Sequence, residues 1–287
     1  MGKTLLGICA SPRKLGNCEL FVKEIFKRMG DGWELRMVRL PEFDIKPCRA
    51  CYQCLFDQLC PLKDDFLVVL NGLADADAYV VAAPTYFLSA NSCLKVFLDR
   101  GLQFYAFMDR LWAKPGAAVA IAGIEGKEGG AKRDVESFVK LSLGDLRGSA
   151  VVYGALPGEV LLSAATLKIA EQLANAILDP AMRQKPAGPV CPICGGDTFR
   201  FVDTARARCM LCSGTGPWEF KNGSIVFNIE PGDHPIFLTK ADALGHADWL
   251  RGMKDKFLAR RQELKEVVKP YLGMGSFIES KRRQEKV

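Results

Sequence analysis

Five short apolar runs alternate with amphipathic segments over residues 1–180, and this alternation restricts the possible fold most strongly. A strand, a helix and a further strand in succession are typical of parallel sheets, whose two faces the helices cover. The sequence therefore predicts an α/β domain with a doubly wound sheet. The predicted strands are Leu5–Cys9, Trp33–Arg39, Tyr79–Ala83, Ala117–Ala122 and Ala150–Tyr153, and the predicted helices are Cys18–Met29, Asp65–Leu73, Ser92–Phe107, Ala131–Leu143 and Ala164–Leu178.

The chain after residue 180 has a different pattern. Several prolines close together mark a linker, and short β-like runs then indicate a small domain over residues 189–232. Apolar residues at helical spacing predict a C-terminal helix over residues 239–269, with Thr239 as its N-cap. Residues 270–287 form a basic tail.

Charge and hydropathy argue against two classes of partner. The formal net charge is +6, but residues 251–287 alone hold 11 Lys/Arg against 5 Asp/Glu, so the rest of the chain is neutral and a nucleic-acid partner is not expected. No apolar stretch approaches the roughly 18 residues that span a bilayer, and the run Thr4–Ala10 is too short for a signal peptide. We therefore expect a cytoplasmic protein without a membrane partner.

Eight of the eleven cysteines fall into two tight clusters, which points to metal rather than to disulfides. The first cluster places four thiols within thirteen residues, between the second predicted strand and the next helix. Two consecutive Cys-x-x-Cys spacings are typical of ligands to a 4Fe-4S cluster. Zinc and free or redox-sensing thiols are the alternatives. The predicted ligands are Cys48, Cys51, Cys54 and Cys60.

The second cluster consists of two Cys-x-x-Cys turns separated by fourteen residues. Two such knuckles close a tetrahedron around one ion, and four filled positions favour structural zinc in a ribbon domain. A single rubredoxin-like iron is the alternative, because it uses the same ligands. The predicted ligands are Cys191, Cys194, Cys209 and Cys212.

The loop after the first predicted strand suits a phosphate group. Its N–H groups lie at the start of a helix, whose dipole favours an anion, and its polar side chains add donors. It matches neither Walker A nor the Gly-x-Gly-x-x-Gly fingerprint, so we expect a mononucleotide. A turn capped by Asn17 is the alternative, and the helix start predicts a lowered thiol pKa for Cys18. The candidate residues are Ser11, Arg13, Lys14, Gly16, Asn17 and Cys18.

Three segments carry a family pattern: Ser11-Pro-Arg-x-x-Gly-Asn17, the Pro84-Thr-Tyr-Phe-Leu-Ser loop before a helix ending in Leu98-Asp-Arg100, and the glycine-rich Ala122–Gly130. Together they resemble the flavodoxin-like, NAD(P)H-dependent FMN reductase superfamily. The resemblance implies a sheet of order 2-1-3-4-5, with the first segment at the FMN phosphate and the others at the flavin ring. The additional cofactor-binding residues that it implies are Pro84, Thr85, Tyr86, Phe87, Ser89, Gly123, Ile124, Glu125, Gly126, Gly129 and Gly130.

The position of the first cysteine cluster resembles, within this superfamily, the iron-sulfur flavoproteins of anaerobes. That resemblance covers residues 1–180 and favours the 4Fe-4S interpretation. It also implies a homo-oligomer, a dimer or tetramer, in which flavin and cluster lie close across a subunit contact. The second cysteine cluster is outside the ordinary pattern of these proteins, so their partners and substrates do not transfer directly.

These features favour an FMN-dependent oxidoreductase. It would couple hydride or electron transfer between NAD(P)H or a ferredoxin-like donor, the cluster, and a quinone-like, nitro-like or protein acceptor. We predict no catalytic acid or base, since both histidines, His234 and His246, lie outside the flavin domain. Asp99 and Arg100 are interpreted as a structural ion pair. The alternative function is an electron-relay protein that serves a partner reductase and has no small-molecule substrate.

Overall fold

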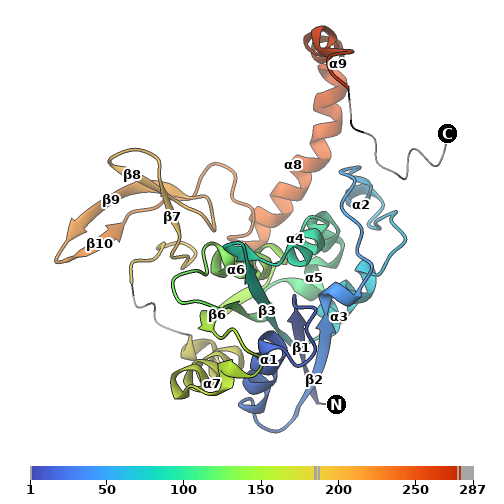
Figure 1. Cartoon of the computed structure of the whole chain (residues 1–287). Helices are drawn as coiled ribbons and strands as arrows, with labels where there is room; N and C mark the ends of the chain where they lie inside the picture. Colours follow the sequence, from blue (N-terminus) through green and yellow to red (C-terminus); the bar gives the residue numbers. More distant parts are fainter. Residues whose placement is uncertain (1, 184–185, 187, 277, 279–287) are drawn as a thin grey trace. The chain divides into compact units, whose positions relative to one another are not determined.

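The computed structural model describes residues 2–183, 186, 188–276 and 278 (Figure 1). The chain divides after Ala247 into two compact units. The larger unit contains a mainly parallel sheet and a separate antiparallel sheet. Within the described ranges, no helix is long and apolar enough to cross a membrane.

The parallel sheet and its helices lie before residue 180. The strands are β1 (Lys3–Cys9), β2 (Trp33–Arg39), β3 (Ala78–Tyr86), β4 (Ser89–Ala90), β5 (Pro115–Ala122) and β6 (Asp145–Tyr153). The helices are α1 (Asn17–Lys27), α2 (Gln53–Phe56), α3 (Phe66–Asp75), α4 (Ser92–Leu98), α5 (Met108–Leu111), α6 (Ala131–Leu141) and α7 (Ala164–Leu178). All five predicted strands are present, whereas β4 and α2 were not predicted.

The five long strands lie in the order β2-β1-β3-β5-β6, and every neighbouring pair is parallel. The short β4 pairs only with β3, in antiparallel fashion, and lies outside this order. When the five long strands alone are numbered along the chain, their order is the predicted 2-1-3-4-5. The chain moves to one side of β1 to form β2 and then to its other side to form β3. In sheets of this kind a ligand binds at that switch point, beyond the carboxyl ends of the strands.

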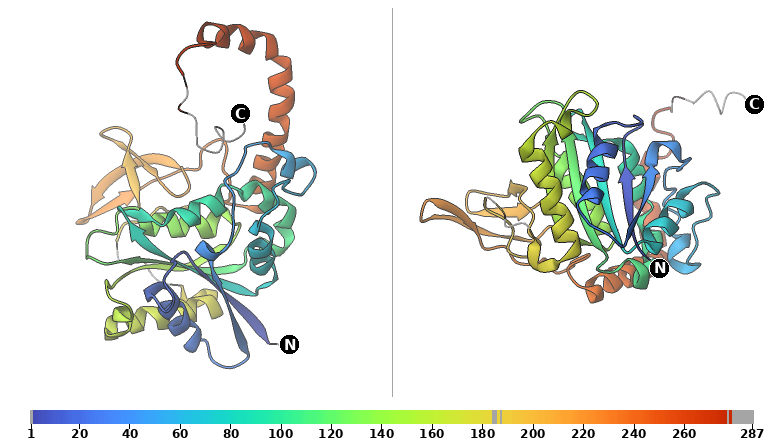
Figure 2. Two further views of the ribbon diagram at one scale, coloured as in Figure 1. Left: turned by 45° about the vertical axis from the view of Figure 1, so that its right-hand side comes forward. Right: turned by 90° about the horizontal axis from the view of Figure 1, so that it is seen from below.

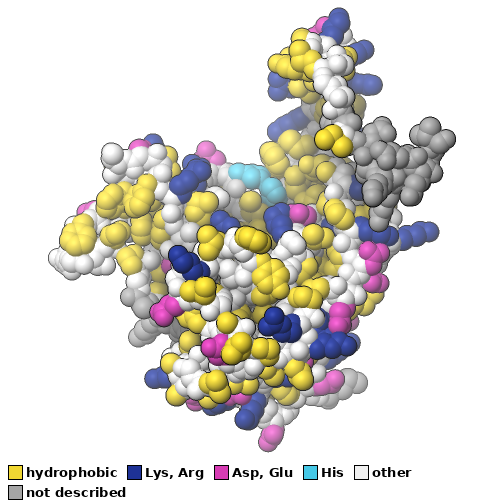
Figure 3. Space-filling view, in the orientation of Figure 1, with side chains coloured by type: hydrophobic (Ala, Val, Ile, Leu, Met, Phe, Trp, Pro, Cys, Tyr) yellow, Lys and Arg dark blue, Asp and Glu magenta, His cyan; other side chains and the backbone are white. Residues whose placement is uncertain are grey.

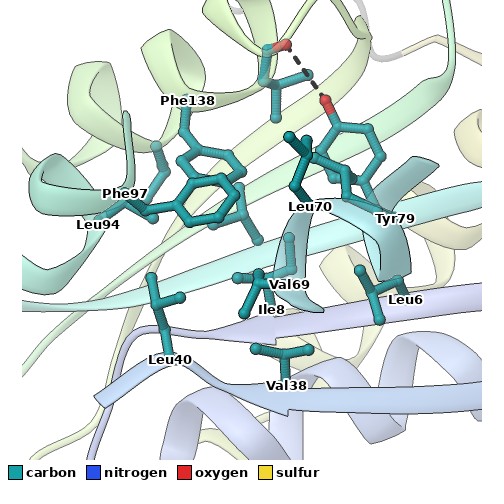
Figure 4. Close-up of a cluster of buried hydrophobic side chains, with 14 of the residues drawn as sticks. Leu6, Ile8, Val38, Leu40, Val69, Leu70, Tyr79, Leu94, Phe97 and Phe138 are labelled. Carbon is teal, nitrogen blue, oxygen red and sulfur yellow. Dashed lines mark hydrogen bonds between the residues drawn. The ribbon is translucent and has the colours of Figure 1, made fainter. Parts of the chain in front are cut away.

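Helices cover both faces of the parallel sheet (Figure 2). Successive side chains of a strand point to opposite faces, so β1 contributes to two cores. Leu6 and Ile8 pack with residues of α3, α4 and α6 (Figure 4), whereas Leu5 and Cys9 pack with residues of α1 and α7. Because both faces of β1, β3 and β5 are buried, these strands are apolar runs, whereas the edge strand β2 alternates apolar and polar residues. These patterns explain why the strand positions were predictable.

The predicted helix Ser92–Phe107 is wrong in its second half. The helix α4 ends at Leu98, and Gly101–Phe107 forms a 3-10 helix. Glycine is a poor helix former, and the 3-10 turn brings Phe104 into the core, where its ring lies 5.8 Å from that of Phe97. Packing of this aromatic side chain therefore outweighs continuation of the α-helix.

The second sheet is antiparallel, with the order β10-β9-β8-β7. It has its own small core, in which the rings of Phe199 and Phe227 stack at 3.7 Å. In Figure 3 hydrophobic side chains also gather on the outside of this sheet. Phe201 on β7 and Phe220 on β9 are both exposed. The strands are β7 (Phe199–Phe201), β8 (Arg206–Cys209), β9 (Thr215–Lys221) and β10 (Ser224–Phe227).

The helix α8 (Lys240–Ala259) begins in the larger unit, and the smaller unit contains the rest of it and α9 (Arg261–Val268). The predicted N-cap Thr239 is present: its hydroxyl accepts a hydrogen bond from the N–H of Asp242, whose carboxylate accepts one from the N–H of Thr239. The domain limits at residues 180, 189, 232, 239 and 269 stay predictions.

Tyr79 joins the sheet to the end of α6 through a fully buried hydroxyl group. This hydroxyl lies 3.0 Å from Ser142 Oγ and 3.2 Å from the carbonyl oxygen of Val139. Figure 4 shows a hydrogen bond of the Tyr79 hydroxyl. A Cβ at Gly144 would lie 2.0 Å from the same hydroxyl oxygen, so glycine is required there.

We expect Tyr79→Phe to lower the free energy of unfolding by about 1 kcal/mol, because it removes the buried hydrogen bonds of the hydroxyl with Ser142 and Val139. Urea unfolding of the purified protein measures this. The control is Tyr153→Phe, which removes a hydroxyl from a partly exposed ring and is expected to change stability by less than about 0.5 kcal/mol. Equal losses in the two variants would contradict the prediction.

Candidate functional site

Three loops follow the carboxyl ends of β1, β3 and β5, which are neighbours in the parallel sheet. They contain residues 10–16, 87–91 and 123–130 and correspond to the three predicted flavin-binding segments. The fold therefore places the predicted phosphate-binding and ring-binding residues at one edge of the sheet. Which of them contact a flavin stays a prediction, but their local geometry can be described.

Glu19, in the first turn of α1, fixes the loop after β1. Its carboxylate accepts a hydrogen bond from the N–H of Leu15 at 3.0 Å and also binds Lys23 and Arg39. Leu15 has a φ of 50°, so the loop makes a tight turn at this residue. The helix α1 then begins at Asn17 without a side-chain cap, which leaves its first N–H groups open to an anion.

Two predicted phosphate contacts differ from expectation in detail. Both ends of the Asn17 amide are used within the protein, because Asn17 donates to the carbonyl of Gly154 at 2.9 Å and accepts from the N–H of Gly158 at 2.8 Å. Burial raises the pKa of the Cys18 thiol well above its usual value, so the predicted lowering of that pKa is wrong. Desolvation outweighs the helix dipole here.

The loop after β3 is a tight hairpin with an exposed aromatic tip. Thr85 pairs with Ala90, and the turn residues Phe87 and Leu88 both have positive φ, 48° and 64°. Asn-Gly is the usual sequence at such turn positions, and bulky residues are strained there. Phe87 is fully exposed, so its own packing does not explain the strain. Such strain is typical of residues that a binding site must present.

The hairpin is fixed to the glycine-rich loop and to α6. The N–H of Gly130 donates to the Leu88 carbonyl at 2.8 Å, and a Cβ at Gly129 would lie only 2.2 Å from that carbonyl oxygen. Asp134, at the start of α6, accepts hydrogen bonds from the Ser89 hydroxyl and from the N–H of Ala90. Sequence reasoning missed Asp134 and Glu19, because each acts on a loop from a neighbouring helix.

The site also has a buried donor that suits a flavin. The Thr85 hydroxyl oxygen is buried and has no hydrogen-bond partner among the described residues. Buried hydroxyl groups nearly always have partners. A polar edge of a bound flavin would satisfy this group, so the residues present fit FMN.

We expect Gly129→Ala to weaken FMN binding at least about tenfold, because the added methyl group must displace the Leu88 carbonyl and the hairpin with it. Fluorescence titration of the apoprotein with FMN measures this. Gly30→Ala is the matched control: Gly30 lies outside the three loops and also has a positive φ, 78°, but nothing lies within 4 Å of its added Cβ. Equal weakening of FMN binding by both variants would contradict a specific role for the close approach of Gly129 to the Leu88 carbonyl.

The stability of the fold is expected to depend on pH through Glu19. Burial disfavours its charged form, but hydrogen bonds from Lys23, Arg39 and the N–H of Leu15 lower its pKa from 4.5 to about 2. A carboxylate with a lowered pKa stabilises the fold above its unfolded pKa, and this contribution is lost as the pH falls toward its folded pKa. The relevant window is therefore from about pH 5 to about pH 2.

We expect Glu19→Gln to cost about 2 kcal/mol of stability at pH 7 and progressively less below pH 5. Urea unfolding at a series of pH values measures this. Glu42→Gln is the control, since Glu42 binds the same Arg39 but its side chain is 50% exposed against 11% for Glu19. If the free energies of unfolding of Glu19→Gln and the native protein differed by the same amount from pH 7 to pH 3, the prediction would be contradicted.

The first four cysteines lie on the segment between β2 and α3 and together line one small cavity, with Arg100 among its other lining residues. Their spacing is wider than a single ion requires, because no three of their sulfurs lie within 4.8 Å of one another. Burial and, to a smaller extent, the nearby sulfurs of Cys60, Cys48 and Cys51 together raise the pKa of the Cys54 thiol to about 11. A cationic group is therefore needed to hold all four as thiolates.

The second four cysteines form a compact tetrad. The Sγ atoms of Cys191, Cys194, Cys209 and Cys212 all lie within 4.8 Å, with separations of 3.7 Å for Cys191 and Cys212 and 3.5 Å for Cys194 and Cys209. Bonds of about 2.3 Å to a tetrahedral zinc would place sulfurs roughly 3.8 Å apart. These four residues fit a single metal ion.

Both halves of the tetrad are built in the same way. In the first knuckle, the backbone N–H of Cys191 donates to the carbonyl of Gly196 at 2.8 Å, and the backbone carbonyl of Cys191 accepts from the N–H of Gly195 at 2.9 Å. In the second knuckle, Cys209 makes the corresponding bonds with Gly214 and Ser213, at 2.9 and 3.0 Å. The structure thus brings together all four residues that the sequence spacing paired.

Comparison with known proteins decides the family. The chain matches the NADPH-dependent FMN reductase family over residues 4–151, slightly more than half of its length. The chain belongs to this family. It is accordingly an oxidoreductase, and the flavodoxin-like resemblance of the three loops is confirmed at the level of the family.

Several similar proteins carry a more specific name. An iron-sulfur flavoprotein from Archaeoglobus fulgidus is 30% identical over 180 residues, which cover 61% of this chain and 78% of that protein. One from Methanosarcina thermophila is 31% identical over 137 residues, covering 47% and 70%. A solved flavone reductase superposes with a TM-score of 0.72 over 96% of this chain and 100% of its own, at 18% identity, which shows a shared fold.

Proposed function

We propose that this member of the FMN reductase family is an iron-sulfur flavoprotein oxidoreductase. FMN binds at the three loops, a 4Fe-4S cluster is held by Cys48, Cys51, Cys54 and Cys60, and zinc is held by the compact tetrad in the ribbon. NAD(P)H or a ferredoxin-like protein donates electrons, and a quinone-like, nitro-like or protein acceptor receives them. We further propose that the protein is cytoplasmic and acts as a homo-oligomer.

The different spacing of the two cysteine sets carries this proposal. Ligands of one ion must gather within the reach of its bonds, as the tetrad does. The first set surrounds a cavity instead, as ligands of a polynuclear cluster do. The relatives named iron-sulfur flavoproteins support this assignment. A single iron in place of zinc in the tetrad is the alternative, because it would use the same four sulfurs.

The bound groups supply the redox chemistry: FMN exchanges two electrons or one, and the cluster exchanges one. The protein positions them and controls access to them. The open N–H groups at the start of α1 bind the phosphate, Glu19 holds the loop that presents them, and Asp134 and Gly129 fix the hairpin at the ring. No side chain of the site is required to move a proton.

Anaerobic reduction tests the proposed enzyme against the electron-relay alternative. We expect NADPH to bleach the flavin absorption, and steady-state turnover with a quinone or a nitroaromatic acceptor to follow. A flavone is a further acceptor to test, given the name of the structural relative. Rapid reduction by reduced ferredoxin with negligible NADPH activity would favour the relay, and the absence of bound flavin would overturn both.

Single cysteine variants should separate the two metal sites. We expect Cys54→Ser to lose most of its iron while it keeps zinc and flavin, because only a ligand of the first set is removed. Cys194→Ser should instead lose zinc, keep iron and flavin, and unfold the ribbon. Metal analysis and flavin absorption after anaerobic purification measure this. Loss of the same metal from both variants would contradict two separate sites.

A further inference from the structure

Arg100 lies next to the first cysteine set, and its ion-pair partner is not the one that the sequence predicted. The predicted ion pair of Asp99 with Arg100 is wrong, since Asp99 pairs with Lys95 and Arg100 pairs with Asp64. The side chains of Arg100 and Asp64 are each only 1% exposed. A buried pair of this kind usually contributes little net stability, so its position calls for another explanation.

The guanidinium group of Arg100 is held on three sides. One terminal nitrogen, Nη1, donates to Asp64 Oδ2, and Cζ lies 4.1 Å from the centre of the Phe66 ring. The other, Nη2, donates to the Sγ atom of Cys60 at 3.1 Å. Asp64 is itself fixed by the N–H groups of Lys46 at 2.9 Å and Phe66 at 3.2 Å. The fork of Arg100 is thus aimed at a cysteine sulfur.

A further donor of the same side chain has no protein partner. The Nε atom of Arg100 is buried and unpaired among the described residues, and Arg100 lines the cavity with the four cysteines. Buried charged donors are costly unless they meet an acceptor. A sulfide of a cluster held between the four thiolates would provide one. This unpaired donor is independent of the contact with Cys60, and it belongs to a side chain that lines the same cavity.

We propose that Arg100 is a positioning residue for the iron-sulfur cluster, which it orients through Cys60 and whose reduction potential it raises. This inference rests on the proposed function, because it requires the cluster. Reduction moves one electron from the flavin or an external donor to the cluster and adds one negative charge to it and its thiolates. A donated hydrogen bond to a ligand sulfur stabilises that added charge, so the reduced state is favoured.

Asp64 has the opposite effect on the cluster. Its negative charge partly neutralises the guanidinium group that faces the sulfur, and it fixes the orientation of the fork. Removal of Arg100 should therefore lower the reduction potential, and neutralisation of Asp64 should raise it. General damage to the cysteine segment would not give opposite signs.

The experiment is an anaerobic redox titration of the full-length protein, with the reduced cluster measured by electron paramagnetic resonance. We expect Arg100→Gln to shift the equilibrium at least tenfold toward the oxidised cluster, which corresponds to about 59 mV for one electron. Arg100→Lys should shift it in the same direction, since lysine keeps the charge but lacks the planar fork. Asp64→Asn should shift it the other way.

Arg110→Gln is the matched control. Arg110 also pairs with an aspartate, Asp75, and lies over a phenylalanine ring, that of Phe107 at 5.4 Å, but its ion pair is exposed. This variant should leave the potential unchanged. Far-UV circular dichroism and flavin content confirm that each variant is folded.

Unchanged potentials in Arg100→Gln and Arg100→Lys, with full iron content, would overturn the inference. Shifts of the same sign in the Arg100 and Asp64 variants would also overturn it, because that result indicates structural damage. If Arg100→Gln folds but holds no cluster, the directions of the potential shifts in Arg100→Lys and Asp64→Asn test the inference instead. If the native protein itself holds no cluster, the proposed function fails and this inference fails with it.

Discussion

The strand order of the parallel sheet is the constraint on which the flavin site depends. Because β1, β3 and β5 are adjacent and parallel, the loops that follow them must emerge at one edge, although more than a hundred residues separate the first loop from the last. The loops themselves are then fixed by polar contacts from helices, such as those of Glu19 and Asp134. The sheet determines where the site lies, and these contacts determine its shape.

The cysteine-rich segment depends on a different kind of support. Between β2 and α3 the regular structure is limited to a short 3-10 turn and the four-residue α2, so backbone ladders do not hold the four sulfurs in place. Side chains from the end of α4 and the turn after it take that role. Arg100 reaches Cys60, and Gln103, fully buried, donates to the carbonyl of Gln58 at 2.8 Å. The same turn that ends α4 early therefore also supports the cysteine-rich segment.

Much of the fold followed from the sequence because buried parallel strands are apolar runs. The prediction was weakest where exposure changes along a strand: β6 begins at Asp145, five residues before its predicted start, since its first residues are only partly buried and include polar ones. The tetrad was predictable because its spacing encodes its geometry. Arg100 and Asp64 were not, since 36 residues separate them and only the folded chain brings them together. The Cys18 pKa was mispredicted because burial cannot be read from one helix start.

The account stands on two metal sites of different nuclearity in one flavoprotein. The most direct test is the quantity of iron, acid-labile sulfide and zinc per chain in protein purified without oxygen. The account predicts about four irons, about four sulfides and about one zinc. Zinc in both cysteine sets, with no sulfide, would contradict it and would leave the four cysteines of the first set as a second structural zinc site.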